Sequence, residues 1–171
     1  SELTADSQHK IRWVYENNDG SADKNTAWVD DLLVGNIGMY TTGFENAGTA
    51  LDNFITGGAG TVEVDLTVSN TGSNSIEMYD PATTWGGGNA TTSFEKSVTL
   101  AKDGSVSFYW KAETDGAFSV DTWYGDLLNF YVDGQLKATT GGKTSWEMVE
   151  ITGISSGTHT LKWEYKEDTG Y

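Results

Sequence analysis

The sequence predicts an all-β fold, an antiparallel β-sandwich of jelly-roll type. Many short segments alternate apolar and polar residues, which is the period-2 pattern of a strand with one buried face. Twenty-one glycines against one proline separate these segments together with Asn, Asp, Ser and Thr, as turn residues do. No window sustains the period of an amphipathic helix. We therefore expect two antiparallel sheets packed face to face.

The N-terminal third holds two predicted strands between polar segments. Residues 1–8 are polar and are predicted to form a tether. Residues 9–16 alternate apolar and mostly charged side chains and are predicted to form a strand. Residues 27–34 are apolar except for two aspartates, which predicts a central strand. The glycine-rich stretch 36–60 is expected to be a linker or loop.

The rest of the chain predicts strands joined by turns. In residues 61–68 the alternation is clean, so four apolar side chains are expected to face the core: Val62, Val64, Leu66 and Val68. Further strands are predicted at 76–78, 94–100, 106–110, 127–132, 135–139, 146–151 and from His159. Asp133-Gly134 is the strongest hairpin signal, because both residues tolerate the positive φ of a type I′ turn.

The first predicted strand is repeated at the end of the chain. Residues 9–20 align with residues 159–170, and the matched pairs are His9 with His159, Ile11 with Leu161, Trp13 with Trp163, Tyr15 with Tyr165, and Gly20 with Gly170. Repeat units of this length are normally whole domains, so the chain is expected to be out of phase with its repeat. The alternative is chance similarity between two amphipathic strands.

The repeat predicts a division of the chain. Residues 61–171 are expected to be the main jelly-roll body, and residues 9–60 the end strands of a preceding repeat plus a glycine-rich connection. The body then lacks its own version of the 27–34 strand. Either the N-terminal strand fills that place within the chain, as in a circular permutation, or a neighbouring molecule supplies it by strand complementation.

The composition excludes some classes of partner. Twenty-five acidic and ten basic residues give a formal net charge of −15, which argues against nucleic-acid binding. The same charge attracts divalent cations, or it serves solubility alone. Cysteine is absent, so no disulfides are expected. No apolar run is long enough to predict insertion into a membrane.

Four strand motifs resemble a bacterial family. They are Val-Ser-Phe-Tyr-Trp-Lys from Val106, Leu-Leu-Asn-Phe-Tyr-Val-Asp-Gly from Leu127, Trp-Glu-Met-Val from Trp146, and Gly-Thr-His-Thr-Leu-Lys-Trp-Glu-Tyr from Gly157. In these motifs the chain resembles the jelly-roll domains, related to MAM and concanavalin-like modules, that recur in secreted and surface-anchored bacterial proteins. The resemblance covers residues 85–171 and 9–34.

The resemblance implies a non-catalytic extracellular module, secreted or on the cell surface, that acts in adhesion or carbohydrate binding. A glycan or neighbouring copies of the chain are its expected partners. In that family an Ala-Trp-hydrophobic-Asp-Asp strand follows the Gly-Thr-His strand, whereas here it stands upstream, within residues 19–31. The displaced strand leaves an alternative open, a structural subunit that assembles into a filament or array by strand complementation.

Hard oxygen donors gather around one loop and the strand after it, which is the chemistry that calcium requires. The predicted ligands are Asn17, Asp19, Asp23, Asp30 and Asp31. Their spacing does not match an EF-hand loop. Solvated turn carboxylates are the alternative.

A glycan site is predicted in the acidic, aromatic segment 112–126, with one further tryptophan from a glycine-rich loop. Exposed aromatic rings stack on sugar rings, and nearby carboxylates orient the sugar hydroxyls. The predicted ligand-binding residues are Trp85, Asp115, Asp121, Trp123, Tyr124 and Asp126. Trp13, Trp110 and Trp163 alternate with polar residues and are expected in the core. Trp28 and Trp146 stay open, and Trp146 is also a glycan-binding candidate.

No catalytic activity is expected. Glu63-Val64-Asp65 begins the carboxylate pattern of concanavalin-like glycoside hydrolases, but Thr67 and Val68 stand where the second glutamate belongs. His9 and His159 occupy equivalent strand starts and are expected to be structural.

Overall fold

The computed structural model describes residues 26–34, 40–79, 90–114 and 126–167. These residues form eleven strands and no helix, and none of them belongs to a helix that could span a membrane. The strands are β1 (Thr26–Val34), β2 (Tyr40–Thr42), β3 (Ile55–Gly58), β4 (Thr61–Asp65), β5 (Ser75–Tyr79), β6 (Thr91–Leu100), β7 (Gly104–Glu113), β8 (Leu127–Val132), β9 (Gln135–Gly141), β10 (Glu147–Ile154) and β11 (Gly157–Lys166).

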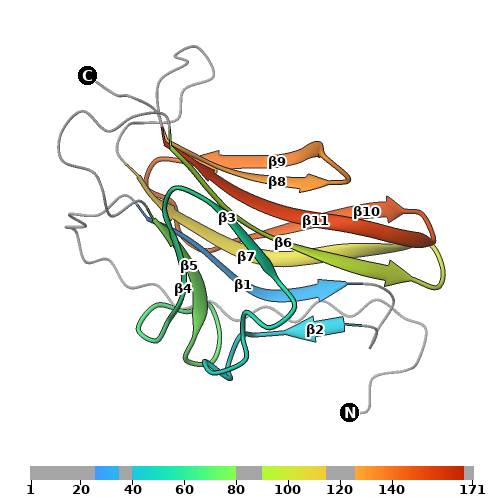
Figure 1. Ribbon diagram of the computed structural model, residues 1–171, viewed down its shortest axis with the longest axis horizontal. Coiled ribbons are helices and arrows are strands. Elements are labelled where there is room, and N and C mark those ends of the chain that lie inside the picture. The colour runs from blue at the N-terminus through green and yellow to red at the C-terminus, as the bar shows by residue number, and fades with distance from the viewer. Residues whose placement is uncertain (1–25, 35–39, 80–89, 115–125, 168–171) are drawn as a thin grey trace.

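The strands form two antiparallel sheets. The six-stranded sheet has the order β10-β7-β1-β5-β4, with β2 paired to β1, and the five-stranded sheet has the order β3-β6-β11-β8-β9. Most strands run along the long axis of the molecule, whereas β3, β4 and β5 run more steeply at one end (Figure 1). The predicted all-β antiparallel sandwich is therefore confirmed.

An aromatic cluster fills the space between the sheets. Trp163 stacks on Phe94 at a centroid distance of 4.8 Å and an interplanar angle of 8°. Its ring also contacts Phe108 and Phe130, at 5.2 and 4.9 Å. Each of these rings is at most 1% exposed, and each comes from an inward-facing position of a different strand. Trp163 lies in the core as predicted, and so does Trp110.

β1 is the central strand that the sequence predicts, with β7 on one side and β5 on the other. Val29 and Leu32 point into the core. The pairing with β7 shifts register between Asp30 and Leu33, and Asp31 has φ 52°. The two aspartates in this apolar strand therefore form a β-bulge, where the extra residue turns polar side chains away from the core.

The hairpin prediction is confirmed and one core prediction is wrong. Asp133 and Gly134 connect β8 to β9 with φ values of 51° and 75°, as a type I′ turn requires. Leu66, predicted to face the core, is 61% exposed. The strand stops before it, because Asp65 Oδ1 accepts hydrogen bonds from the backbone N–H groups of Thr67 and Val68 and so turns the chain.

The glycine-rich stretch 36–60 contains two short strands, where we expected linker or loop. β2 pairs with β1, and β3 pairs with β6 at the edge of the five-stranded sheet. Residues 46–54 between them turn through three backbone hydrogen bonds. These segments therefore belong to the same sandwich as the strands of residues 61–171.

Of the two segments that repeat in the sequence, the structure describes most of the second and none of the first. Residues 159–166 belong to β11, which lies between β6 and β8, whereas residues 9–20 are not described. β1 lies in its own chain's sheet, so within the chain the place of the 27–34 strand is filled. The assignment of residues 9–60 to a preceding repeat stays a prediction, and the same holds for the tether at 1–8.

Candidate functional site

Polar and aromatic side chains line the solvent side of the five-stranded sheet, which we call the open face. Phe130 and Val132 of β8 point into the core, so Asn129 and Tyr131 point outward, and β11 alternates in the same way. The backbone pairing aligns two rows across the sheet. One row holds Glu95, Lys162 and Tyr131, and the next holds Ser93, Glu164, Asn129 and Thr139.

Three side chains on the neighbouring strands β8 and β11 of the open face are joined by hydrogen bonds to Glu164. The Tyr131 hydroxyl donates to Glu164 Oε1 at 3.1 Å, and Lys162 Nζ donates to Glu164 Oε2 at 2.6 Å. The Lys162 ammonium also lies 5.8 Å from the centroid of the Tyr131 ring. Both oxygen atoms of the carboxylate are thereby fixed in position. This triad places an aromatic ring beside an ionised acceptor and an ionised donor.

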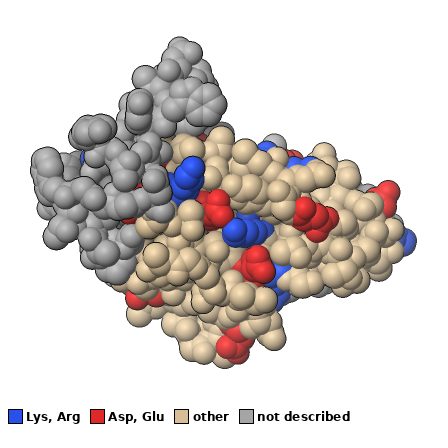
Figure 2. Space-filling view, turned by 45° about the horizontal axis from the view of Figure 1, so that its top comes forward, with Lys and Arg blue, Asp and Glu red and all other residues tan. Residues whose placement is uncertain are grey.

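The electrostatics of the triad follow from its partial burial. Lys162 and Glu164 side chains are 32% and 18% exposed. Burial, the negative charge of Glu164 and the hydrogen bond to it raise the pKa of the Tyr131 hydroxyl. Tyr131 therefore stays a hydrogen-bond donor at neutral pH. Acidic and basic side chains lie next to one another across one face of the molecule, without a large patch of either sign (Figure 2).

Exposed apolar side chains flank the open face at both edges. Ile55 on β3 pairs with Glu95 and is 67% exposed. Leu136 on β9 pairs with Tyr131 and is 54% exposed. The row through Tyr131 therefore runs across all five strands and ends in an apolar residue at each edge.

The outer face of the six-stranded sheet holds the tryptophan whose place the sequence left open. Trp28 pairs with Lys111 and Glu77 on the side of β1 away from the core. Its indole N–H donates to Asp65 Oδ2 at 2.8 Å, and Lys111 Nζ lies 4.8 Å from the ring centroid. Lys111 is in turn paired with Glu113. Trp28 is 5% exposed, so its ring is covered and is not open for stacking on a ligand.

Two of the predicted calcium ligands lie in the β1 bulge and bind a neighbouring turn. Asp30 Oδ2 accepts hydrogen bonds from the backbone N–H groups of Asn70 and Thr71. Asp31 accepts from the side chains of the same two residues. Burial and the charge of Asp31 raise the pKa of Asp30 to about 7, against the N–H groups that lower it.

No metal-binding group of three or more acidic, His or Cys side chains occurs within the described ranges. The other three predicted ligands, Asn17, Asp19 and Asp23, lie outside them. The calcium site therefore stays a prediction.

The predicted glycan-binding residues are only partly described. Asp126 is buried, and its Oδ2 accepts a hydrogen bond from the Tyr165 hydroxyl at 3.0 Å. Trp146, the further candidate, is half-buried just before β10. The other five predicted residues lie outside the described part: Trp85, Asp115, Asp121, Trp123 and Tyr124.

The triad was not predicted from the sequence. Its members stand at outward positions of strands that were predicted, so the period-2 pattern places each of them on a solvent face. The sequence does not give the register between β8 and β11, and that register is what brings Tyr131 beside Lys162. A search for aromatic residues at outward strand positions would have found Tyr131.

This chain is similar to solved structures but matches no protein-family model. No protein-family model matches the sequence, and no match was found among curated proteins. Among solved structures, that of TmCBM61 in complex with beta-1,4-galactotriose is similar to this chain, with a TM-score of 0.48 and 13% sequence identity. The similarity covers 70% of this chain and 81% of that chain.

Proposed function

We propose that this chain is a non-catalytic carbohydrate-binding β-sandwich module and that the open face of the five-stranded sheet binds the glycan. The observation that carries the proposal is the Tyr131–Glu164–Lys162 triad. An ion pair at a protein surface contributes little to stability, and Lys162 and Glu164 form such a pair, partly buried, on a solvent face. A fixed array of donors and acceptors beside an aromatic ring has the composition of a binding site.

The triad provides an apolar ring together with hydrogen-bond acceptors and donors that a sugar can use. The Tyr131 ring provides an apolar surface for one face of a pyranose. Each oxygen of the Glu164 carboxylate has a further lone pair that can accept a hydrogen bond from a sugar hydroxyl, and the Lys162 ammonium has further donors. Because two backbone strands hold all three side chains, little conformational entropy is lost when a glycan binds.

Glycan arrays followed by calorimetry test the proposal. A Tyr131→Ala variant is expected to weaken binding of a glycan identified on the array by at least about tenfold, which is about 1.4 kcal/mol. The matched control is Tyr109→Ala, because Tyr109 is also half-buried but lies on the outer face of the other sheet. Equal loss in the two variants, or no loss in Tyr131→Ala, would remove the open face from consideration.

The absence of catalysis is part of the proposal. Glycoside hydrolysis requires one carboxyl group that donates a proton and a second that acts as base or nucleophile. Both oxygens of Glu164 are already engaged by Lys162 and Tyr131, which suits an ionised acceptor and not a proton donor. Reducing-end assays on the bound glycan are expected to show no hydrolysis, and product formation would contradict this part.

An extracellular role in adhesion is the biological setting that we propose for such a module. The high negative charge of the whole chain suits a soluble secreted or surface-attached protein. Localisation of the protein in fractionated cells tests this setting. A purely intracellular pool would contradict it.

A second candidate function, assembly with copies of itself, is favoured by one observation. Three of the exposed large apolar side chains lie on edge strands: Ile55 on β3, Leu136 on β9 and Met148 on β10. Exposed edge strands with apolar residues are templates for pairing with another chain. Light scattering at rising protein concentration tests this role, and a Leu136→Lys variant is expected to reduce any association that β9 mediates.

A further inference from the structure

A cavity of about 190 Å³ lies between the β8–β9 hairpin and the turn from β10 to β11. The edge strands β9 and β10 of the two sheets both contribute to it. Val132, Ile151 and Ile154 supply apolar surface, while Gln135, Lys137 and Thr152 supply polar groups. Asp133 and His159 also line it, and they hold the two turns together.

Asp133 and His159 bind each other across the two turns. His159 Nδ1 lies 2.7 Å from Asp133 Oδ2, and its Nε2 lies 2.8 Å from the carbonyl oxygen of Ser155. Both ring nitrogens therefore face acceptors, and a ring that is protonated at both nitrogens donates to both of them. The other Asp133 oxygen accepts from the N–H of Thr160. When the ring is protonated, the pair contributes structure to the cavity and no net charge.

Three side chains have hydrogen-bond donors left for a ligand. Lys137 Nζ donates to Gln135 Oε1 at 3.1 Å, which leaves two donors on the ammonium and the amide group of Gln135. The Thr152 hydroxyl makes no hydrogen bond within the described ranges. When His159 is protonated, its charge balances that of Asp133, and Lys137 then gives the lining a net positive charge. Such a set of donors suits a carboxylate.

We propose that this cavity binds a sugar residue that bears a carboxylate, a uronic acid, at a site separate from the open face. The carboxylate contacts Lys137, Gln135 and Thr152, and the apolar side of the ring lies on Ile151, which is half-buried. A cavity of this volume accommodates one sugar ring. The formal net charge of −15 opposes an anion only weakly at this point, because charges more than about 8 Å away are largely screened at physiological ionic strength.

Titration of the full chain with D-glucuronate and D-galacturonate, followed by amide chemical shifts, tests the proposal. Shifts are expected for residues of the β8–β9 turn and of 151–155. D-glucose lacks the carboxylate and acetate lacks the ring, so both are expected to bind at least about tenfold more weakly. If no uronate binds, or if glucose or acetate binds as well as the uronates, the assignment is overturned.

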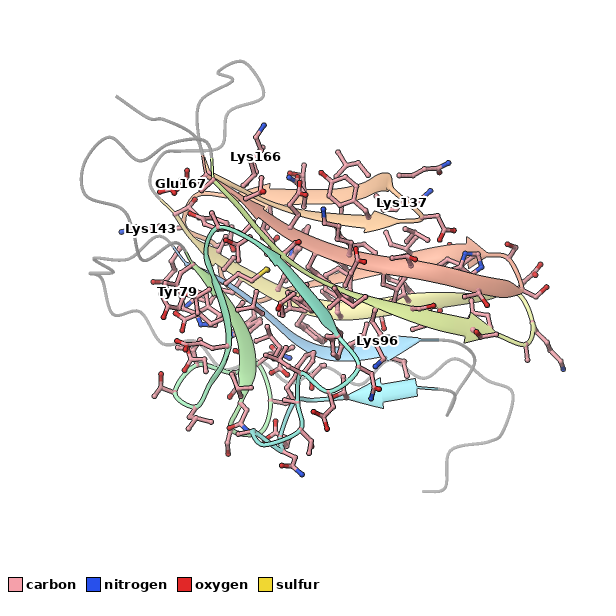
Figure 3. The ribbon with its side chains drawn as sticks, viewed as in Figure 1. Tyr79, Lys96, Lys137, Lys143, Lys166 and Glu167 are labelled. Atoms are coloured by element: carbon pink, nitrogen blue, oxygen red, sulfur yellow. The ribbon has the colours of Figure 1, made fainter. Side chains whose placement is uncertain are left out.

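Two exposed lysines make a matched pair for mutation. Lys137 and Lys143 lie toward opposite ends of the long axis (Figure 3), and only Lys137 lines the cavity. Lys137→Ala is expected to lose uronate binding, while Lys143→Ala keeps it; equal behaviour of the two contradicts the site. Tyr131→Ala is expected to bind uronate as the wild type does, so failure of the open-face proposal and failure of this one give different results.

Discussion

The imidazole of His159 and the carboxylate of Asp133 join the turns at one end of the sandwich, with Nδ1 2.7 Å from Oδ2. The contact links the start of β11 to the hairpin turn between β8 and β9. His159 was expected to be structural, and its 9% exposure and two hydrogen bonds fit that role. The contact also makes the stability of this end depend on pH.

The first prediction concerns that dependence. The hydrogen bonds to Asp133 and to the Ser155 carbonyl raise the pKa of His159 above its usual 6.5. Its contribution to the free energy of unfolding is therefore complete below pH 6.5 and is lost as the pH rises through the folded pKa. The hydrogen bonds from His159 and from the N–H of Thr160 lower the pKa of Asp133. The contribution of Asp133 to the free energy of unfolding is therefore complete above pH 3.8 and is lost as the pH falls through its folded pKa.

Asp133→Asn tests the pair without disturbing the turn, because asparagine also tolerates positive φ. We expect the pKa of His159, measured by NMR titration, to fall toward 6.5. At pH 6 the variant should lose less than about 1 kcal/mol of stability, since the Asp133 side chain is 49% exposed. The control is Asp52→Asn, at an exposed aspartate. An unchanged pKa of His159 in Asp133→Asn would contradict the assignment.

The second prediction concerns Asp30 in the β1 bulge. Burial and the charge of Asp31 raise the pKa of Asp30 to about 7. Because the folded pKa lies above the unfolded value, its contribution to stability is complete below pH 3.8 and is lost as the pH rises toward 7. The upper bound is about 1.4 kcal/mol for each unit of difference between the two pKa values.

Asp30→Asn removes this titration, and asparagine resembles the protonated acid. We expect urea unfolding at pH 4 to 8 to show a weaker pH dependence for the variant than for the wild type. Asp103→Asn, at an exposed aspartate, is expected to leave the dependence unchanged. If the free energy of unfolding of the Asp30→Asn variant and that of the wild type change with pH in parallel, this prediction is contradicted.

The third prediction concerns the turn from β3 to β4. Gly58 has φ 99°, and a Cβ atom there would lie 1.9 Å from the carbonyl oxygen of Thr91. Gly58→Ala is expected to destabilise the fold by about 1–3 kcal/mol from backbone strain alone, and more from the contact. At Gly57 a Cβ would meet Ser93 Oγ at 3.5 Å, so Gly57→Ala is the control with little effect. Thermal melts of the two variants test this prediction. Equal melting temperatures would contradict the claim that Gly58→Ala strains the backbone.

Strands whose own residues alternate between apolar and polar were predictable from the sequence. A strand that is extended only because a neighbouring strand pairs with it was not. β6, β7, β8 and β11 each carry alternating apolar residues that must be buried, so the pattern is sufficient. β3 has the sequence Ile-Thr-Gly-Gly, which has no such pattern, and it is extended because β6 provides hydrogen-bonding partners.

The candidate site was harder to predict for a related reason. Tyr131, Lys162 and Glu164 become neighbours only through the pairing of β8 with β11. Trp28 stayed undecided because its surroundings depend on the position of β1 between β5 and β7. An aromatic residue at an outward position is predictable, but whether it is open or covered depends on residues far away in the chain.

The fourth prediction is the calcium site proposed for residues 17–31. If calcium binds there, the melting temperature of the full chain should rise when calcium is added and fall with EDTA, because a ligand that binds only the folded state stabilises it. Asp19→Asn with Asp23→Asn should abolish the shift, whereas Asp103→Asn should keep it. No change in melting temperature with calcium or EDTA would end the proposal.

The fifth prediction concerns the contact between Trp28 and Asp65 on the outer face of the six-stranded sheet. Burial raises the pKa of Asp65, but hydrogen bonds from Thr67, Trp28 and Val68 outweigh it, and the net pKa is lowered. Trp28→Phe keeps a ring below Lys111 and removes one of these donors. We expect a loss of about 1.5 kcal/mol at pH 7.

Because the folded pKa of Asp65 lies below its unfolded value, this contribution is complete above pH 3.8 and is lost as the pH falls. The difference between Trp28→Phe and the wild type should therefore shrink in acid. Trp146→Phe is the control, because the Trp146 indole makes no hydrogen bond among the described residues. Urea unfolding at pH 7 and pH 3 measures both, and a deficit that stays constant across this range would show that ring volume, not the hydrogen bond to Asp65, is what the substitution removes.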